Sequence, residues 1–511
     1  MSERFTGAKA LESGLGSPGW TSSDERENRR IAVLGSEVFA NMLSLVANVD
    51  LITPTELETM PNNLDAIVVV PSCKLRWGVD VSRDGKLLLD ARRVAESHGV
   101  RLDLYDFNDT MNRDDLAEAT TLFDAVITNS PVEFEKSPAP NEITNRLHLF
   151  PYPISTQRFN PVGLESARRR ELVYYKESGS RIPLSARRAL SGASTAKIAT
   201  RIYSAGSPLM NKILDATGVD LENNVIHPVE VLPDLAAYDA ESRFAEFAVC
   251  DGISPADDAG GVGILGHLAR GTIVFADYSR FINGAIPSVA MVESGKDLQS
   301  YISNLPSEYA DLVRVNGIRY VFTTSTIWDW IERYEEDLLG ERVPEPLIVV
   351  ISSNQEDFEQ FTSMQTVSGS FYRASDDKDA DALIGSRRAL KIYLDRIPFR
   401  TPNLYADIKC ALRYSDASHF EVCAADDPRI AYNESEGVGG LEVHAVRAGE
   451  EGKTTRSMLI RTDALRHADG LNKPNFGRLA KNDLTIVIPV FNNGKHLLYK
   501  ALQSLWRESV Q

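Results

Sequence analysis

The most constraining feature of the sequence is an alternation, from Arg30 onward, of short β-rich apolar runs with stretches whose apolar residues recur at helical spacing. The runs RRIAVLGS, LDAIVVVPSC, RLDLYDFND and DAVITNSP fit strands, whereas GKLLLDARRVAESHGV fits a helix that ends at Gly99. Strand and helix in this order predict parallel strands joined by right-handed crossovers. The alternation therefore predicts a doubly wound α/β domain with a ligand crevice at the carboxyl ends of its strands.

Polar residues follow these predicted strands at the edge where a ligand would bind: Ser72, Asp106, Asn108, Asp109, Asn129 and Ser130. Asn129 and Ser130, after the last of the four runs, are candidates for ligand contacts on this ground. The same residue types are common in turns, so ordinary turn chemistry explains them equally well. Both interpretations stay open at this point.

A second α/β segment spans about 164–335 and contains the glycine pattern GxGxxG at Gly261, Gly263 and Gly266. That pattern is typical of dinucleotide sites, which also carry an acidic residue about 20 residues further on. The acidic candidate Asp277 comes too early, so a nicotinamide-dependent oxidoreductase is the weaker alternative. The glycines fit better a helix start that approaches a neighbouring strand or offers backbone N–H groups to a phosphate.

Length and composition limit the class of protein. A chain of 511 residues suggests about three domains of roughly 100–200 residues. A net charge of -17 argues against general binding to nucleic acid, because phosphate contacts need clustered Lys and Arg. The four cysteines and eight histidines lack the spacing of a disulfide framework or a histidine-built metal site. No apolar run fits a signal peptide or approaches the roughly 20 residues of a membrane span, so we expect a cytoplasmic protein with a disordered tail over 1–28.

A third region follows a linker at Pro344 and Pro346. It begins with LIVVISSNQEDFEQF, which has the same order of strand, polar turn and helix as LTIVIPVFNNGKHLL from Leu484. This is the candidate for an internal repeat. The second copy runs only to Gln511, so we expect the chain to be part of a longer protein.

The stretch LTIVIPVFNNGKHLLYKALQSLWRESVQ resembles the first strand and helix of family 2 glycosyltransferases, which have the GT-A fold. The resemblance implies that Pro489, Phe491 and Asn492 line the nucleotide pocket for a sugar donor. It also implies that the acidic residues of this domain lie beyond Gln511, so that the segment 483–511 is only the start of a catalytic domain.

Residues 345–480 resemble a degenerate earlier copy of the same family, carried by RASDDKDAD, FEVCAADDP and SMLIRTDALRHADG. The resemblance implies that Asp376 and Asp377 touch the nucleotide, and that Asp426 and Asp427 hold a divalent cation, Mn²⁺ or Mg²⁺, which would neutralise the donor diphosphate. Ala424 replaces the first acid of the metal motif, and no Glu-Asp base motif follows HADG. We therefore expect an inactive or much-altered GT-A-like domain, with solvated loop acids as the alternative for these aspartates.

The two earlier segments resemble GT-B-type glycosyltransferases related to the CgeB spore-maturation proteins. The resemblance rests on RLDLYDFND, LFDAVITNSP, LHLFPYPISTQRFNP, GILGHLARGTIVFADYS and RYVFTTSTIWDWIERY. It implies two Rossmann-like domains, over 29–163 and 164–340, with donor contacts at Gly261, Gly263, Asn129 and Ser130. It also places a ribose-binding Glu where this sequence has Gly266, which argues against donor binding. His227 fits a structural role better than that of a base.

Together these features predict part of a multidomain bacterial glycosyltransferase that moves a sugar from a nucleotide-sugar donor to a cell-surface or cell-wall glycan. The predicted order is two Rossmann-like domains, a GT-A-like α/β domain, and the first strand and helix of another. The alternative is a non-catalytic module that binds glycan or positions a larger enzyme. Through that larger protein the chain would be peripheral at the inner membrane.

Overall fold

The computed structural model describes residues 30–52, 56–57, 63–70, 85–107, 119–129, 146–176, 190–204, 229–232, 240–250, 263–276, 289–291, 307–340, 347–423, 434–435, 441–444 and 457–461, apart from short gaps at 45, 120, 191, 194–195, 368, 386–388, 398–400 and 416–418. All of these residues belong to one unit, Met1–Ala464. The predicted tail over 1–28 and the predicted domain start over 483–511 lie outside them, and so do Pro489, Phe491 and Asn492.

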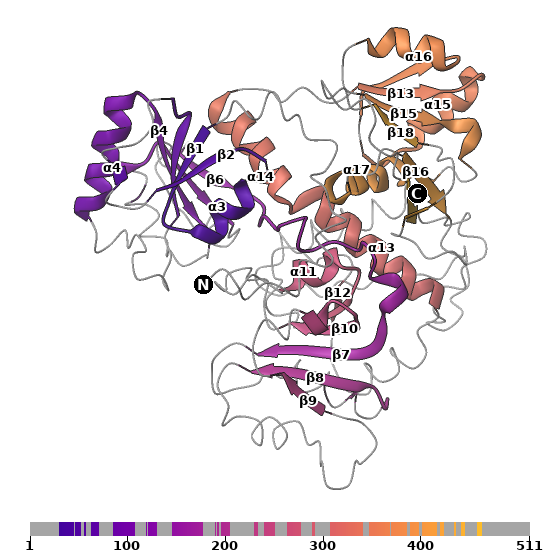
Figure 1. Ribbon diagram of the computed structural model, residues 1–511, viewed down its shortest axis with the longest axis horizontal. Helices are drawn as coiled ribbons and strands as arrows, with labels where there is room; N and C mark the ends of the chain where they lie inside the picture. The colour runs from indigo at the N-terminus through magenta and orange to yellow at the C-terminus, as the bar shows by residue number, and fades with distance from the viewer. Residues whose placement is uncertain are drawn as a thin grey trace, which may run out of the picture. The chain divides into compact units, whose positions relative to one another are not determined.

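The first sheet has the strand order β2-β1-β3-β4-β5-β6, and every neighbouring pair is parallel. Its strands are β1 (Arg30–Leu34), β2 (Asn48–Ile52), β3 (Ala66–Val69), β4 (Arg101–Asp106), β5 (Ala125–Thr128) and β6 (Leu147–Leu149) (Figure 1). β1, β3 and β5 are almost wholly buried apolar runs, as expected for a parallel sheet covered on both faces. The order is that of flavodoxin-like doubly wound folds with one further strand, which confirms the predicted α/β class.

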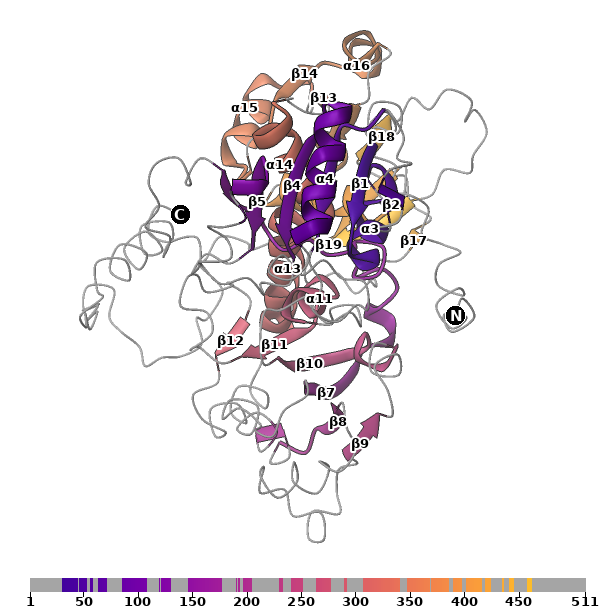
Figure 2. The same ribbon diagram turned by 90° about the vertical axis from the view of Figure 1, so that its left-hand side faces the viewer.

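Helices cover both faces of this sheet. Helix α4 (Gly85–His98) lies across one face, where Figure 2 shows it in front of the strands, and Leu88, Ala91 and Ala95 enter the core there. The helix stops at Gly99, whose φ of +66° is a left-handed end that glycine adopts without strain, as the sequence predicts. Helix α3 (Glu37–Leu43) packs on the opposite face.

The second helix on that opposite face comes from far along the chain. Helix α14 (Ile327–Tyr334) lies in the segment predicted for the second Rossmann-like domain, yet its side chains share the core of the first sheet. Trp330 is fully buried there, with ring centroids 5.0 Å from Phe39, 5.3 Å from Tyr105 and 5.6 Å from Phe150. The chain thus returns from the second sheet to complete the first.

The second sheet has the order β12-β11-β10-β7-β8-β9, again with parallel neighbours throughout. Its strands are β7 (Arg169–Lys176), β8 (Ala199–Ser204), β9 (Val229–Leu232), β10 (Ala245–Cys250), β11 (Ile273–Ala276) and β12 (Val289–Met291). Read from β9, this is the order 3-2-1-4-5-6 of Rossmann folds, in line with the Rossmann-like class that the resemblance implies. Helices α11 (Ile264–Ala269) and α13 (Ser307–Thr324) pack against it.

The third sheet is mixed, with the order β14-β13-β15-β18-β16-β19-β17. Its strands are β13 (Leu347–Ile351), β14 (Phe371–Ala374), β15 (Ala389–Tyr393), β16 (His419–Cys423), β17 (Glu434–Ser435), β18 (Leu441–His444) and β19 (Ser457–Arg461). Its helices are α15 (Gln355–Met364), α16 (Asp377–Ile384) and α17 (Leu404–Tyr414). The predicted strand, polar turn and helix at the start of this region are therefore confirmed as β13 and α15.

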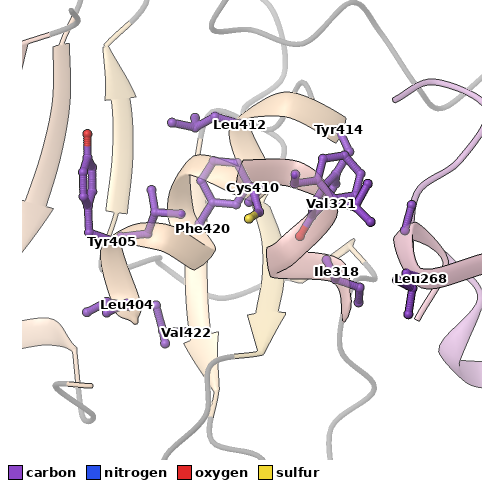
Figure 3. Packing of buried hydrophobic residues seen from close by; sticks show 14 of the residues in the cluster. Leu268, Ile318, Val321, Leu404, Tyr405, Cys410, Leu412, Tyr414, Phe420 and Val422 are labelled. Atoms are coloured by element: carbon purple, nitrogen blue, oxygen red, sulfur yellow. The ribbon is translucent and has the colours of Figure 1, made fainter. Parts of the chain in front are cut away.

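A continuous apolar core joins the second and third sheets through helices. Figure 3 shows Ile318 and Val321 of α13 between Leu268 of α11 on one side and α17 on the other. Short turns complete the described structure: η2 (Glu165–Ala167), η5 (Glu335–Leu339), which is a π-helical turn continuing α14, and η6 (Leu394–Arg396).

Candidate functional site

Each of the three sheets has a point where the strand order reverses, and ligands of open α/β sheets bind at the carboxyl ends of the strands there. These switch points lie between β1 and β3, between β7 and β10, and between β13 and β15. We take the carboxyl ends of the strands at these three switch points as the candidate sites, and call them the first, second and third edge. Several strand-end residues named from the sequence, Ser72, Asn108, Asp109 and Ser130, lie outside the described residues.

At the first edge, Gly35 turns the chain directly after β1 and beside the end of β3. Its φ of +119° is in the region that favours glycine, and a Cβ atom there would lie 2.3 Å from the carbonyl oxygen of Val70. Ser36 follows and caps α3 by accepting a hydrogen bond from the Phe39 N–H at 3.2 Å. Gly35 therefore keeps the backbone of two adjacent strand ends in close approach. In the sequence, the run RRIAVLGS indicated a strand that ends at this glycine.

Asn129 holds the β5–β6 side of this edge together. It is 4% exposed, and its amide nitrogen donates to the carbonyl oxygens of Phe150 and Pro151, both at 3.0 Å. Burial raises the pKa of the nearby Tyr105 hydroxyl well above its ordinary value, although Asn129 lowers it in part. Asn129 thus has a structural role, and its role as a donor contact stays a prediction.

Polar and charged groups also meet between β4 and α14. The Tyr334 hydroxyl donates to a carboxylate oxygen of Asp103 at 2.6 Å, and Arg101 lies 3.0 Å from the other oxygen. Burial raises the pKa of Asp103, and Arg101 and Tyr334 oppose the shift only partly. Burial also raises the pKa of Tyr334 well above its ordinary value, together with the Asp103 charge. These groups fix α14 on β4, a contact that the local sequence pattern does not show.

At the second edge, the predicted helix start is present. Gly263 is the residue before α11, with extended backbone and no side chain to cap the first turn, whereas Gly261 lies outside the described residues. Gly266 lies within α11, where all six residues are buried, including His267. The position where the resemblance places a Glu is therefore a buried helix interior.

At the third edge, Asp376 and Asp377 lie together, but each has a local partner. Asp376 caps α16 by accepting from the Asp379 N–H at 2.9 Å. Asp377 accepts from the Tyr393 hydroxyl at 2.6 Å and lies 3.8 Å from the Lys391 ammonium, which pairs more closely with Asp381 at 2.8 Å. The structure brings the two predicted residues to the strand ends, and it gives both a role in holding α16.

The predicted cation ligands Asp426 and Asp427 lie outside the described residues. Within the described part of the chain, no group of three or more His, Cys, Asp or Glu side chains has the arrangement of a metal site. Asp376 and Asp377 alone do not fit such a site, because both are engaged in local contacts. The Mn²⁺ or Mg²⁺ site thus stays a prediction.

Among the described residues, no helix combines the length and apolar character that crossing a membrane requires. The longest, α13, has 18 residues and carries charged side chains such as Arg314 and Arg319 along its length.

No family model matches this sequence, and no curated protein matches it significantly. Among solved structures, HepE of Anabaena in complex with UDP-glucose is 10% identical with a TM-score of 0.40, over 61% of this chain and 100% of HepE. A glycosyltransferase of Rickettsia africae is 10% identical with a TM-score of 0.40, over 61% of this chain and 99% of its own. The lipopolysaccharide outer core galactosyltransferase WaaB in its apo form is 10% identical with a TM-score of 0.38, over 61% and 99%. At these values the likeness carries no argument for function.

Proposed function

We propose that this chain is part of a glycosyltransferase that takes a sugar from a nucleotide-sugar donor and passes it to a cell-surface or cell-wall glycan. The observation that carries the proposal is the tandem of two doubly wound parallel sheets, each with its own switch point. Such a tandem offers two ligand edges, one for each substrate of a transfer reaction. The sequence resemblance to GT-B-type and family 2 glycosyltransferases supports the same class.

Under this proposal the donor diphosphate lies at the carboxyl edge of the second sheet. Gly263 precedes α11 there without a side chain to cap the first turn, which favours an anion at the backbone N–H groups. Gly261, which lies outside the described residues, is proposed as a second contact. Asn129 and Ser130 at the first edge are the other proposed donor contacts. The acceptor hydroxyl must lose a proton during transfer, and we assign no base among the described residues.

Thermal unfolding with UDP-, GDP- and CDP-sugars, each with and without Mn²⁺, tests the proposal. A donor present at 100 times its dissociation constant should stabilise the chain by roughly 2.7 kcal/mol. The absence of a shift with every donor would contradict donor binding by residues 30–464. NAD in the same series tests the oxidoreductase alternative.

A matched pair of variants at Gly263 locates the donor. Gly263→Asp and Gly263→Asn both supply a good helix cap, so both should preserve or raise the stability of α11. Only the aspartate brings a negative charge against a diphosphate. We expect Gly263→Asp to abolish the donor shift and Gly263→Asn to retain it. Equal shifts in the two variants would place the donor elsewhere.

The same logic applies to the third edge. Asp376→Asn keeps an oxygen that can cap α16, so the stability of the domain should change little. If the carboxylate contacts the nucleotide, the donor shift should be reduced in this variant with and without Mn²⁺. An unchanged donor shift would leave Asp376 as a helix cap only.

The second candidate function is a non-catalytic module that binds glycan or positions a larger enzyme. Two observations favour it: the buried Gly266 at the position where the resemblance places a ribose-binding Glu, and the local engagement of Asp376 and Asp377. This candidate predicts binding to glycans without a donor shift and without release of nucleotide from any donor. Release of UDP, GDP or CDP in an acceptor-dependent manner would contradict it.

A further inference from the structure

The two connections between the first and second sheets lie side by side. Ile154, on the way from β6 to β7, forms a parallel bridge with Thr326, between α13 and α14. The Ile154 N–H donates to the Ser325 carbonyl at 3.1 Å, and the Ile327 N–H donates to the Ile154 carbonyl at 3.2 Å. We call Ile154 together with residues 325–327 the paired connection.

A side chain from the third-sheet domain, residues 347–461, contacts one of the two segments of the paired connection. Arg413 of α17, 9% exposed, donates to the Phe322 carbonyl in the last turn of α13 and to Thr326 Oγ1 at 3.3 Å. It also donates to Asp329 Oδ1 at 2.7 Å. Thr326 and Asp329 form the capping box at the start of α14. One guanidinium therefore binds the end of one helix and the start of the next.

A second ion pair with the opposite polarity lies beside the first. Arg319 of α13 makes two hydrogen bonds to the carboxylate of Asp407 in α17, at 2.8 and 3.0 Å. Planar two-point pairs of this kind fix direction as well as distance. A slide or rotation of α17 relative to α13 and α14 would break both pairs, since Arg319 lies on α13 and Asp329 on α14. The rings of Phe322 in α13 and Tyr414 in α17, with centroids 4.9 Å apart, pack edge to face.

We propose that the third-sheet domain restrains the paired connection, with Arg413 as the positioning residue. Two-domain proteins change shape through the few residues that connect the domains, and any group that binds both ends of such a junction opposes that change. The proposal gives residues 347–461 a role that needs neither a cation nor a donor. It stands independently of the proposed sugar transfer.

Amide hydrogen exchange tests this restraint, because the bridging amides of Ile154 and Ile327 exchange only when the paired connection opens. Arg413→Met keeps much of the side-chain length and removes the guanidinium. We expect exchange at Ile154 and Ile327 to become about tenfold faster or more, while Leu104 in β4 and Val349 in β13 keep their rates. Arg396→Met, which alters an arginine of the same domain at Tyr393, is the matched control and should change neither amide of the bridge.

Two results would overturn the proposal. The first is unchanged exchange at Ile154 and Ile327 in a folded Arg413→Met protein. The second is equal acceleration of all four amides, which would show a general loss of stability and no local restraint. If Arg413→Met does not fold, Arg413→Lys keeps the charge and removes the two-sided geometry. A wild-type rate at Ile154 in that variant would likewise overturn it.

Discussion

Helices α13 and α14 make two different kinds of contact with the sheets that they join. Toward the first sheet, α14 presents rings: Trp330 stacks on Tyr334 at 5.0 Å and meets Phe39 edge to face. Toward the third-sheet domain, the same helix pair adds ion pairs to the apolar contacts of α13. Arg319 of α13 pairs with Asp407, and Arg413 of α17 pairs with Asp329 of α14. Ring burial is non-directional and supplies free energy, whereas buried ion pairs contribute little net stability and instead fix the arrangement. The comparison predicts that the two contacts respond differently to mutation.

The largest effect is expected at the aromatic contact. Trp330→Ala removes the centre of the ring cluster from a fully buried position, which should lower the free energy of unfolding by about 3–5 kcal/mol. Denaturant unfolding measures this loss. Trp330→Phe is the control and should cost clearly less, because it retains a ring in the cavity. A loss below about 1 kcal/mol for the alanine variant would contradict the role of this cluster.

At the ion-pair contact, we expect the effects of mutating the two partners to be coupled. Breaking the pair by Arg319→Met should cost about 3 kcal/mol, because the buried Asp407 carboxylate loses two charge-assisted hydrogen bonds from Arg319. Adding Asp407→Asn should recover part of that loss, giving a coupling free energy of about 0.5–3 kcal/mol in a double-mutant cycle. Strictly additive losses would show that the pair does not act as a unit.

The difference between the two contacts also explains how far the sequence could predict the structure. Local patterns were sufficient for α4 and its end at Gly99, because helical periodicity and a terminal glycine are read within a few residues. The stretch around Trp330 carried only the family resemblance, through RYVFTTSTIWDWIERY, and a local pattern does not show which sheet a helix covers. The ion pair of Asp329 and Arg413 joins residues 84 positions apart, and nothing local links them.

At the candidate sites, too, the positions of residues could be predicted from the sequence but their contacts could not. The strand end that carries Asn129 follows from the strand and helix order, whereas Asp376 and Asp377 were named from the family resemblance. The partners of Asn129 and Asp377 could not be predicted, since the Phe150 carbonyl lies just after β6 and the Tyr393 hydroxyl belongs to β15. A polar residue at a strand end therefore marks an edge of the sheet, and only the partner shows whether it is available to a ligand.

A smaller effect is expected from the polar group inside the aromatic contact. Tyr334→Phe removes the hydroxyl that donates to Asp103 and leaves the ring stack with Trp330 in place. The loss should be about 1–3 kcal/mol, because a buried carboxylate loses one hydrogen bond. Urea unfolding measures it, with Tyr372→Phe on the exposed surface of β14 as the matched control. An equal effect at the two tyrosines would show that the Asp103 contact adds nothing.

The smallest expected effects concern the pH dependence of stability, to which two carboxylates of the first sheet contribute with opposite signs. Burial raises the pKa of Asp103, so the folded state holds its proton more tightly than the unfolded state. Its contribution to stability should then fall as pH rises from 3.8, its ordinary value, through the raised one. Burial alone would raise the pKa of Asp124 too, but the Arg92 guanidinium and the Leu102 N–H outweigh it and lower the pKa. Its contribution is present above 3.8 and is lost as pH falls through the lowered value.

The two asparagine variants should therefore shift the pH dependence of unfolding in opposite directions. The Asp103 contribution to stability decreases with pH, so Asp103→Asn should make the slope of stability against pH more positive above 3.8, the ordinary pKa of the group. The Asp124 contribution to stability increases with pH, so Asp124→Asn should make the slope of stability against pH less positive below about pH 4. Denaturant unfolding at a series of pH values measures both. Slopes that change in the same direction would show that Arg101 and Tyr334 stabilise the Asp103 carboxylate as fully as Arg92 and the Leu102 N–H stabilise that of Asp124.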